Sequence, residues 1–152
     1  MKHKFLEIKD YIDGISLDHA QEHFEDNHFP FIQNRVSGLT TQEEEDFIEF
    51  VFNWSDFQMY IISYLLDHTN FKLKGKYHSG YVFCECFSKI NNVDYLKLLA
   101  QSLELELTFC KNKIGLSINE ITNNLYWVIN TIKDKSWIDS YLKIIENLNT
   151  NS

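Results

Sequence analysis

The side chains whose spacing could most directly do chemistry are the histidines and carboxylates of residues 18–28. This stretch reads DHAQEHFEDNH. His19 and His23 are four residues apart, so on a helix both rings would share one face, as in metal-binding helices. Further oxygen and nitrogen donors follow in the same stretch: Glu22, Asp26 and His28. The residue after His19 is an alanine, so the general base of the H-E-x-x-H motif of zinc proteases is missing. We interpret the stretch as a solvated acidic helix, with a metal-dependent enzyme using His19 and His23 as an alternative.

The remaining sequence contains no catalytic motif of the kinds that carry nucleophiles or bind phosphates. It has no G-x-S-x-G, no P-loop, no G-x-G-x-x-G and no C-x-x-C. Carboxylates are paired near Glu43, but a run of like charge is typical of a solvent-facing surface. A catalytic carboxylate is expected in an apolar pocket that raises its pKa. We therefore predict no enzymatic activity, no cofactor and no metal site.

The cysteines and the N-terminal residues indicate the cellular environment. Cys84, Cys86 and Cys110 form an odd set, and residues 1–14 have neither an apolar core region nor a small-residue cleavage site. Without a secretory signal, three cysteines are expected as free thiols that pack in the core. We expect a soluble, cytoplasmic protein.

The acidic residues are concentrated at one end of the chain. Residues 1–56 hold thirteen acids against four bases, a net charge of −9, whereas residues 57–152 have a net charge of +1. Charge segregated in this way steers partners of opposite sign. It disfavours nucleic acid and anionic membranes as partners. The sequence therefore predicts a basic protein partner, with no nucleic acid and no membrane.

The elements that must position these residues are helices. Apolar residues recur at helical spacing, and the chain has one proline and five glycines, which favours a single all-α domain over residues 1–152. Three helix pairs are predicted between residues 41 and 149: 42–54 with 56–67, 77–90 with 93–106, and 117–133 with 136–149. The pairs begin about 35 to 40 residues apart, as in helical-hairpin repeats that stack into HEAT-like α-solenoids. An irregular helical bundle explains the same spacing.

Residues 1–40 form a less regular, acidic N-terminal segment. We expect a short amphipathic helix around Leu17 to Phe24, with Ser16 as its cap. Residues 27–38 are expected to be extended, because Pro30 disfavours the helical conformation at residue 29.

The helix predicted over residues 42–54 is of special interest. Thr41 and Glu44 have the spacing of a capping box, and one face carries apolar residues: Phe47, Phe50, Val51 and Trp54. The opposite face carries Glu45, Glu49 and Phe52, and Asp56 follows just past the helix end. An aromatic anchor ringed by steering charge is the arrangement of a protein interface. The alternative is that residues 1–40 fold back and cover Phe52.

The predicted partner-binding surface combines these residues with the acids of the N-terminal segment: Asp18, Glu22, Glu25, Asp26, Glu45, Glu49, Phe52 and Asp56. The lysines of residues 70–76 are interpreted as solvent-exposed, with a second, basic contact as the alternative.

The resemblance of the chain to a known family rests on its size, on the helix pairs from Thr41 to Leu148 and on the acidic stretches SLDHAQEHFEDNH and TQEEEDFIEF. In these features the chain resembles bacterial immunity proteins of contact-dependent inhibition and related polymorphic toxin systems. The resemblance implies a cognate basic toxin, a ribonuclease or deoxyribonuclease, whose active site the protein would occlude stoichiometrically. A helical-repeat adaptor or regulatory subunit of a protein assembly is the alternative from another functional class.

Overall fold

The structure, a computed structural model, describes residues 2–16, 23–110 and 115–150, and within these ranges the chain is helical and contains no strand. The elements are, in chain order, α1 (Lys2–Asp13), the π-helix η1 (Phe24–His28), α3 (Phe29–Ser37), α4 (Thr41–Val51), α5 (Asp56–His68), α6 (Ser79–Lys89), α7 (Val93–Phe109), α8 (Ile118–Ile129) and α9 (Lys135–Thr150). The predicted all-α class is confirmed. None of these helices is long and apolar enough to span a bilayer.

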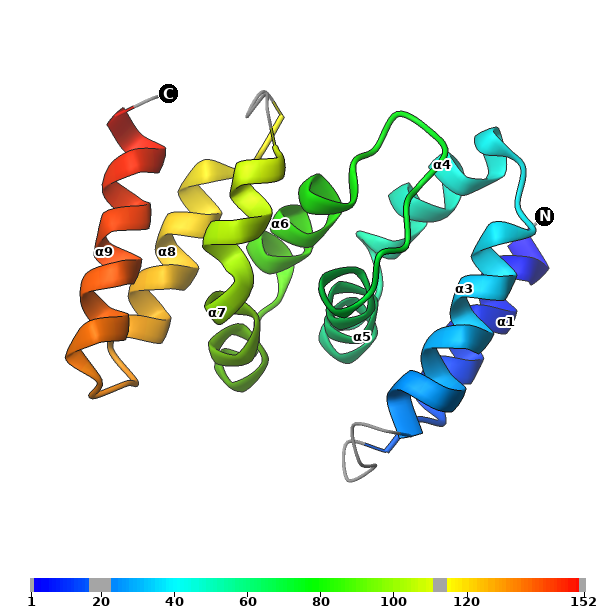
Figure 1. Cartoon of the computed structure of the whole chain (residues 1–152), viewed down its shortest axis with the longest axis horizontal. Coiled ribbons are helices and arrows are strands. Elements are labelled where there is room, and N and C mark those ends of the chain that lie inside the picture. Colours follow the sequence, from blue (N-terminus) through cyan, green and yellow to red (C-terminus); the bar gives the residue numbers. More distant parts are fainter. Residues whose placement is uncertain (1, 17–22, 111–114, 151–152) are drawn as a thin grey trace.

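The helices are laid out in sequence order along the long axis of the molecule. Figure 1 shows α1 and α3 at one end, α9 at the other, and the pair α6 and α7 between them. Helix α6 packs against α5, α7 and α8. Its side chains are buried almost all round: Val82, Phe83, Cys84, Cys86 and Phe87. All three cysteines are buried thiols that form no disulfide, as expected. The core is therefore continuous through the centre of the array.

The N-terminal segment is more helical than predicted. Helix α1 follows from Phe5, Ile8 and Ile12, which repeat at helical spacing and are all buried. The extended conformation predicted for residues 27–38 is wrong, because η1 runs directly into α3 and Phe29 has a helical backbone (φ −64°, ψ −48°). Pro30 lies in the first turn of α3, where its missing N–H breaks no helical hydrogen bond. The helix predicted from Leu17 falls largely on residues 17–22, outside the described ranges.

The N-terminus of α4 is capped one residue earlier than predicted. Thr40, with extended backbone, accepts from the N–H of Glu43, and the Glu43 carboxylate accepts from the N–H of Thr40. Adjacent threonines followed by adjacent glutamates make the pattern ambiguous, since both Thr40 and Thr41 have a glutamate three residues on. This one-residue shift leaves Glu44 available for another contact.

Candidate functional site

The acidic run of α4 holds the segment that joins α5 to α6. Glu44 is only 1% exposed, and its Oε1 accepts from the backbone N–H groups of Lys74 (2.8 Å) and Gly75 (2.9 Å). The ammonium group of Lys74 donates to the carbonyl oxygens of Ser37 and Leu39. The prediction that the acidic run is solvent-facing is wrong at Glu44, which is buried, whereas Lys72, Lys74 and Lys76 are exposed, as predicted. Glu44 and Lys74 nevertheless make these internal contacts.

Glu45 and Glu49 continue this contact. The N–H of Lys76 donates to Glu45 (2.6 Å), and the Tyr77 hydroxyl donates to Glu49 (2.8 Å). The approach at Gly75 is close, because a Cβ there would lie 2.6 Å from the Glu45 Cγ. The carboxylates of Glu45 and Glu49 therefore already accept hydrogen bonds from the α5–α6 segment within the same chain.

The ring of Phe52 lies against two other aromatic rings. Phe52 is half-buried, with its ring 6.4 Å from the rings of Tyr77 and Tyr81 and with the Lys89 ammonium 5.9 Å from its centroid. The cover thus comes from the α5–α6 segment and α6, and not from the N-terminal segment that was the expected alternative. Asp56 accepts from the backbone N–H of Asn91 (3.0 Å). The role of Phe52 as an interface anchor stays a prediction, and its ring is only partly exposed.

Only part of the histidine stretch, residues 23–28, lies within the described ranges, and its two histidines differ in burial. Asp18, His19 and Glu22 lie outside the described residues. His23 is exposed and its Nδ1 lies 3.2 Å from the Asn27 amide nitrogen, whereas His28 is buried with its Nδ1 2.9 Å from the Tyr11 hydroxyl. Within the described ranges, no group of three or more potential metal ligands comes together.

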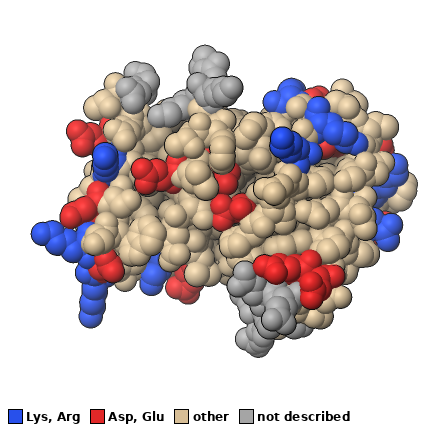
Figure 2. Space-filling model, in the orientation of Figure 1, with Lys and Arg blue, Asp and Glu red and all other residues tan. Residues whose placement is uncertain are grey.

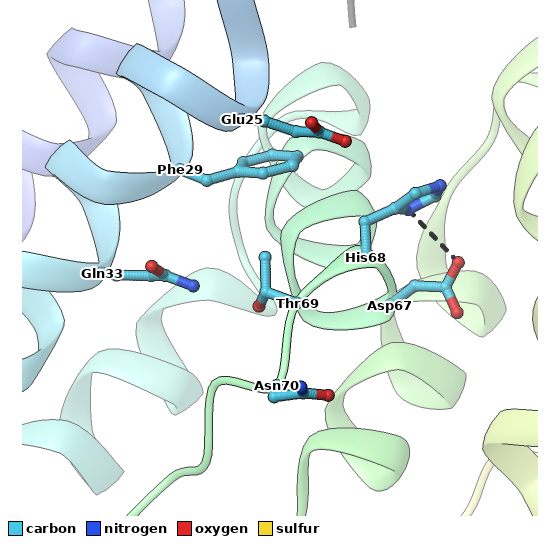
Figure 3. A pocket seen from close by; sticks show the side chains of 7 residues that line it. All are labelled: Glu25, Phe29, Gln33, Asp67, His68, Thr69 and Asn70. Carbon is cyan, nitrogen blue, oxygen red and sulfur yellow. Dashed lines mark ion pairs between the residues drawn. The ribbon is translucent and has the colours of Figure 1, made fainter. Parts of the chain in front are cut away.

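Glu25 and Asp26 are exposed on η1, and Glu25 lines a hollow between η1, α3 and the end of α5. Its volume is about 390 Å³. Figure 3 shows Glu25, Phe29 and Gln33 on one side, facing the end of α5 and the residues after it. The lining is completed by Asp67, His68, Thr69 and Asn70. Glu25, a predicted binding residue, thus lines the same hollow as Asp67, an acid that was not predicted to bind a partner.

A larger hollow of about 870 Å³ adjoins the first, with Asp67, Thr69 and Asn70 common to both. It lies between the segment of residues 69–79 and helices α5 and α7. Its apolar lining is formed by Leu66, Phe71, Leu73, Leu105 and Phe109. Its charged lining comprises Asp67 and Glu106 together with Lys72 and Lys76. We call this space the α7 groove.

The two carboxyl groups of the α7 groove form a pair. Glu106 is only 5% exposed, and its pKa is raised to about 7 by burial, by the negative charge of Asp67 and by a hydrogen bond between the two side chains. Asp67 also accepts from the Ser102 hydroxyl (2.7 Å), and its Oδ2 lies 3.4 Å from the His68 Nδ1. Glu106 therefore exchanges its proton close to neutral pH and not in the acidic range of an ordinary glutamate.

Asp67 and Glu106 were not predicted as a pair, because they lie on different helices and share no local motif. A signal existed, however, because Glu106 follows Leu99 and Leu103 on the inward face of α7. A glutamate in register with buried leucines is a candidate for a perturbed carboxyl group.

The charges visible on this face are unevenly distributed. Figure 2 shows basic atoms gathered at the upper right and acidic atoms gathered beside the undescribed residues and toward the middle of the molecule. Exposed apolar side chains border the α7 groove, since Leu105 is 56% and Phe109 49% exposed.

Comparison with known proteins gives no relative: no family model, no curated protein and no solved structure matches the chain.

Proposed function

We propose that this protein binds a basic protein partner, a nuclease toxin, and neutralises it as a stoichiometric immunity protein. The acidic composition of residues 1–56 supports a partner of opposite charge. Occlusion requires complementarity of shape and charge, and no catalytic step. The resemblance to immunity proteins of toxin systems points in the same direction.

The observation that carries the proposal is the surface formed by η1, the end of α5 and the outer side of α7. Glu25 and Asp67 face one hollow, and Asp67 and Glu106 face the next. Leu105 and Phe109 stand exposed at the edge of the α7 groove. Apolar anchors beside desolvated acids are the elements of a binding hot spot. We place the docking face here, because the α4 acids already serve internal contacts.

Co-expression with the protein encoded by the neighbouring open reading frame, followed by co-purification, tests the proposal. We expect a one-to-one complex in which Leu105→Ala together with Phe109→Ala weakens binding by about 2 kcal/mol or more. Leu142→Ala on α9 is a matched control, since Leu142 is also exposed but lies on another helix. Unchanged affinity in the double variant would place the interface elsewhere, and the absence of any basic partner would contradict the function.

A second candidate function follows from the Asp67–Glu106 pair, because a protonated carboxylic acid beside an ionised one can act as a general acid. The two functions differ in stoichiometry. An inhibitor abolishes toxin activity at one equivalent, whereas an enzyme that modifies the partner acts at a small fraction of an equivalent. Titrating the toxin's activity against the protein decides between them.

A further inference from the structure

The α7 groove is lined by both apolar and charged side chains. Leu105 and Phe109 border it from α7, and Phe71 and Leu73 border it from the opposite segment. At about 870 Å³ it has ample room for one long side chain. Glu106 lines the groove and is only 5% exposed, and its carboxyl group is hydrogen-bonded to that of Asp67, which lines the groove as well.

The two carboxyl groups of the α7 groove, those of Asp67 and Glu106, favour a cation as ligand. Two adjacent carboxyl groups repel when both are ionised, and here a proton on Glu106 relieves the repulsion. A cationic ligand would relieve it as well. A guanidinium group suits the position best, because it is planar, stays charged, offers five donors and stacks on aromatic walls such as Phe71 and Phe109.

We propose that the α7 groove is a binding site for one arginine side chain, with its guanidinium group beside the carboxyl groups of Asp67 and Glu106. The identification of the arginine with one on the partner's surface rests on the proposed function. The site itself is defined by the groove and its carboxyl pair.

Binding of the guanidinium group would displace the proton of the Glu106 carboxyl group, so the affinity for arginine depends on pH. At acidic pH the arginine must compete with the proton on Glu106, so its affinity should rise by up to tenfold per pH unit up to about pH 7 and then level off. His68 lies beside the pair, with its Nδ1 3.4 Å from the Asp67 Oδ2.

Other titratable groups around the pair do not reverse this direction. Burial raises the pKa of Tyr77 to about 12 and the pKa of Cys84 is raised as well, so both stay neutral. The His78 Nδ1 accepts from the N–H of Gly80. Lys72 and Lys76 also line the groove, and both are exposed.

The test is an NMR titration of the full chain with N-acetyl-arginine amide, at concentrations up to roughly 10 mM and from about pH 5 to about pH 8. N-acetyl-citrulline amide is the control probe, since it has the same shape without the charge. We expect shifts of the amide signals of Asp67, Ser102 and Glu106 with the arginine probe alone. Glu106→Gln should weaken binding at least tenfold and abolish its dependence on pH, because the exchangeable proton is gone.

Glu104→Gln is the matched control variant. It removes the same charge from α7 two residues away, at an exposed position, and should change affinity less than about twofold. Equal binding of the citrulline probe, or equal effects of Glu104→Gln and Glu106→Gln, would overturn the proposal. Circular dichroism melts of both variants establish that any loss is not a loss of folding.

The failure of this proposal and of the proposed function are distinguishable. If the basic partner binds but the arginine probe does not shift these amide signals, the site is wrong and the function stands. If the arginine probe binds and no basic partner does, the site stands and the function is wrong.

Discussion

Three buried glutamates lie in the described helices, and their carboxylates meet different neighbours. Glu44 accepts from the N–H groups of Lys74 and Gly75, and Glu85 accepts from the N–H of Ser117 at 2.6 Å. Glu106 instead meets the carboxyl group of Asp67. Backbone donors stabilise an ionised carboxylate, whereas a second carboxylate destabilises it. Glu44 and Glu85 therefore hold loops in place as ionised carboxylates. Of the three, only Glu106 can exchange a proton near neutral pH.

At Glu106 we predict a stability that falls as pH rises. Its folded-state pKa of about 7 lies above the ordinary value of 4.5, so the folded protein holds a proton that the unfolded chain releases. The free energy of unfolding should fall by about 3 kcal/mol at most between these two pKa values. Urea unfolding across this pH range measures the slope.

Glu106→Gln should remove this contribution, since glutamine does not ionise. Glu104→Gln should keep it. A wild-type slope that Glu106→Gln leaves unaltered would show that the pKa of Glu106 is not raised.

At Phe52 we predict an effect on stability. Phe52→Ala should lower the free energy of unfolding by about 2 kcal/mol, because its ring packs against Tyr77 and Tyr81. Tyr126→Ala on α8 is the control, since Tyr126 is 46% exposed and should cost little. Thermal melts and partner titrations are compared. A loss of affinity without a loss of stability would identify Phe52 as an interface anchor.

At the scale of single elements, the segment between α5 and α6 depends on α4. We predict that Glu44→Ala destabilises the protein by about 3 kcal/mol, since the variant leaves the N–H groups of Lys74 and Gly75 without their acceptor. Asp46→Ala, which removes an acceptor of the Gln42 side chain on the same helix, should cost much less.

Hydrogen exchange reports on this contact residue by residue. In Glu44→Ala the amides of Lys74 and Gly75 should exchange faster, while those of α6 remain protected. Protection of both amides equal to that in the wild type would mean that Glu44 does not hold the segment.

The elements also show what the sequence could predict. The six helices from residue 41 onward were predictable because their apolar spacing is regular, and all six are found. Helix α1 carried the same signal in Phe5, Ile8 and Ile12, but it was not assigned. Helix α3 was missed because Pro30 was interpreted as a breaker and not as a first-turn residue.

The candidate site could be predicted only in part. Glu25 and Asp26 were chosen for their charge, and Glu25 does line a hollow. Asp67 and Glu106 come together only through the packing of α5 against α7, which no local pattern encodes. Glu44 was misinterpreted for the converse reason, since a run of charge does not reveal that a distant loop supplies its donors.

At the scale of the whole molecule, the uneven charge sets the rate of encounter with a partner. With a net charge of −9 on residues 1–56, we predict an association rate near 10⁸ M⁻¹s⁻¹ at low salt that falls steeply as the salt concentration rises. Stopped-flow mixing with the basic partner from about 0.05 to about 0.5 M salt measures it. A rate independent of salt would remove any steering role from this charge.

The layout of the helices in sequence order has a consequence for cooperativity. Helix α9 packs mainly on α8, whereas α6 is enclosed by α5, α7 and α8. In this arrangement, unfolding of the terminal helix disrupts mainly one interface, whereas unfolding of the centre disrupts several. The molecule should therefore fray from its C-terminal end, so that the last helix opens in brief excursions while the α7 groove, built on the enclosed middle of the array, keeps its shape.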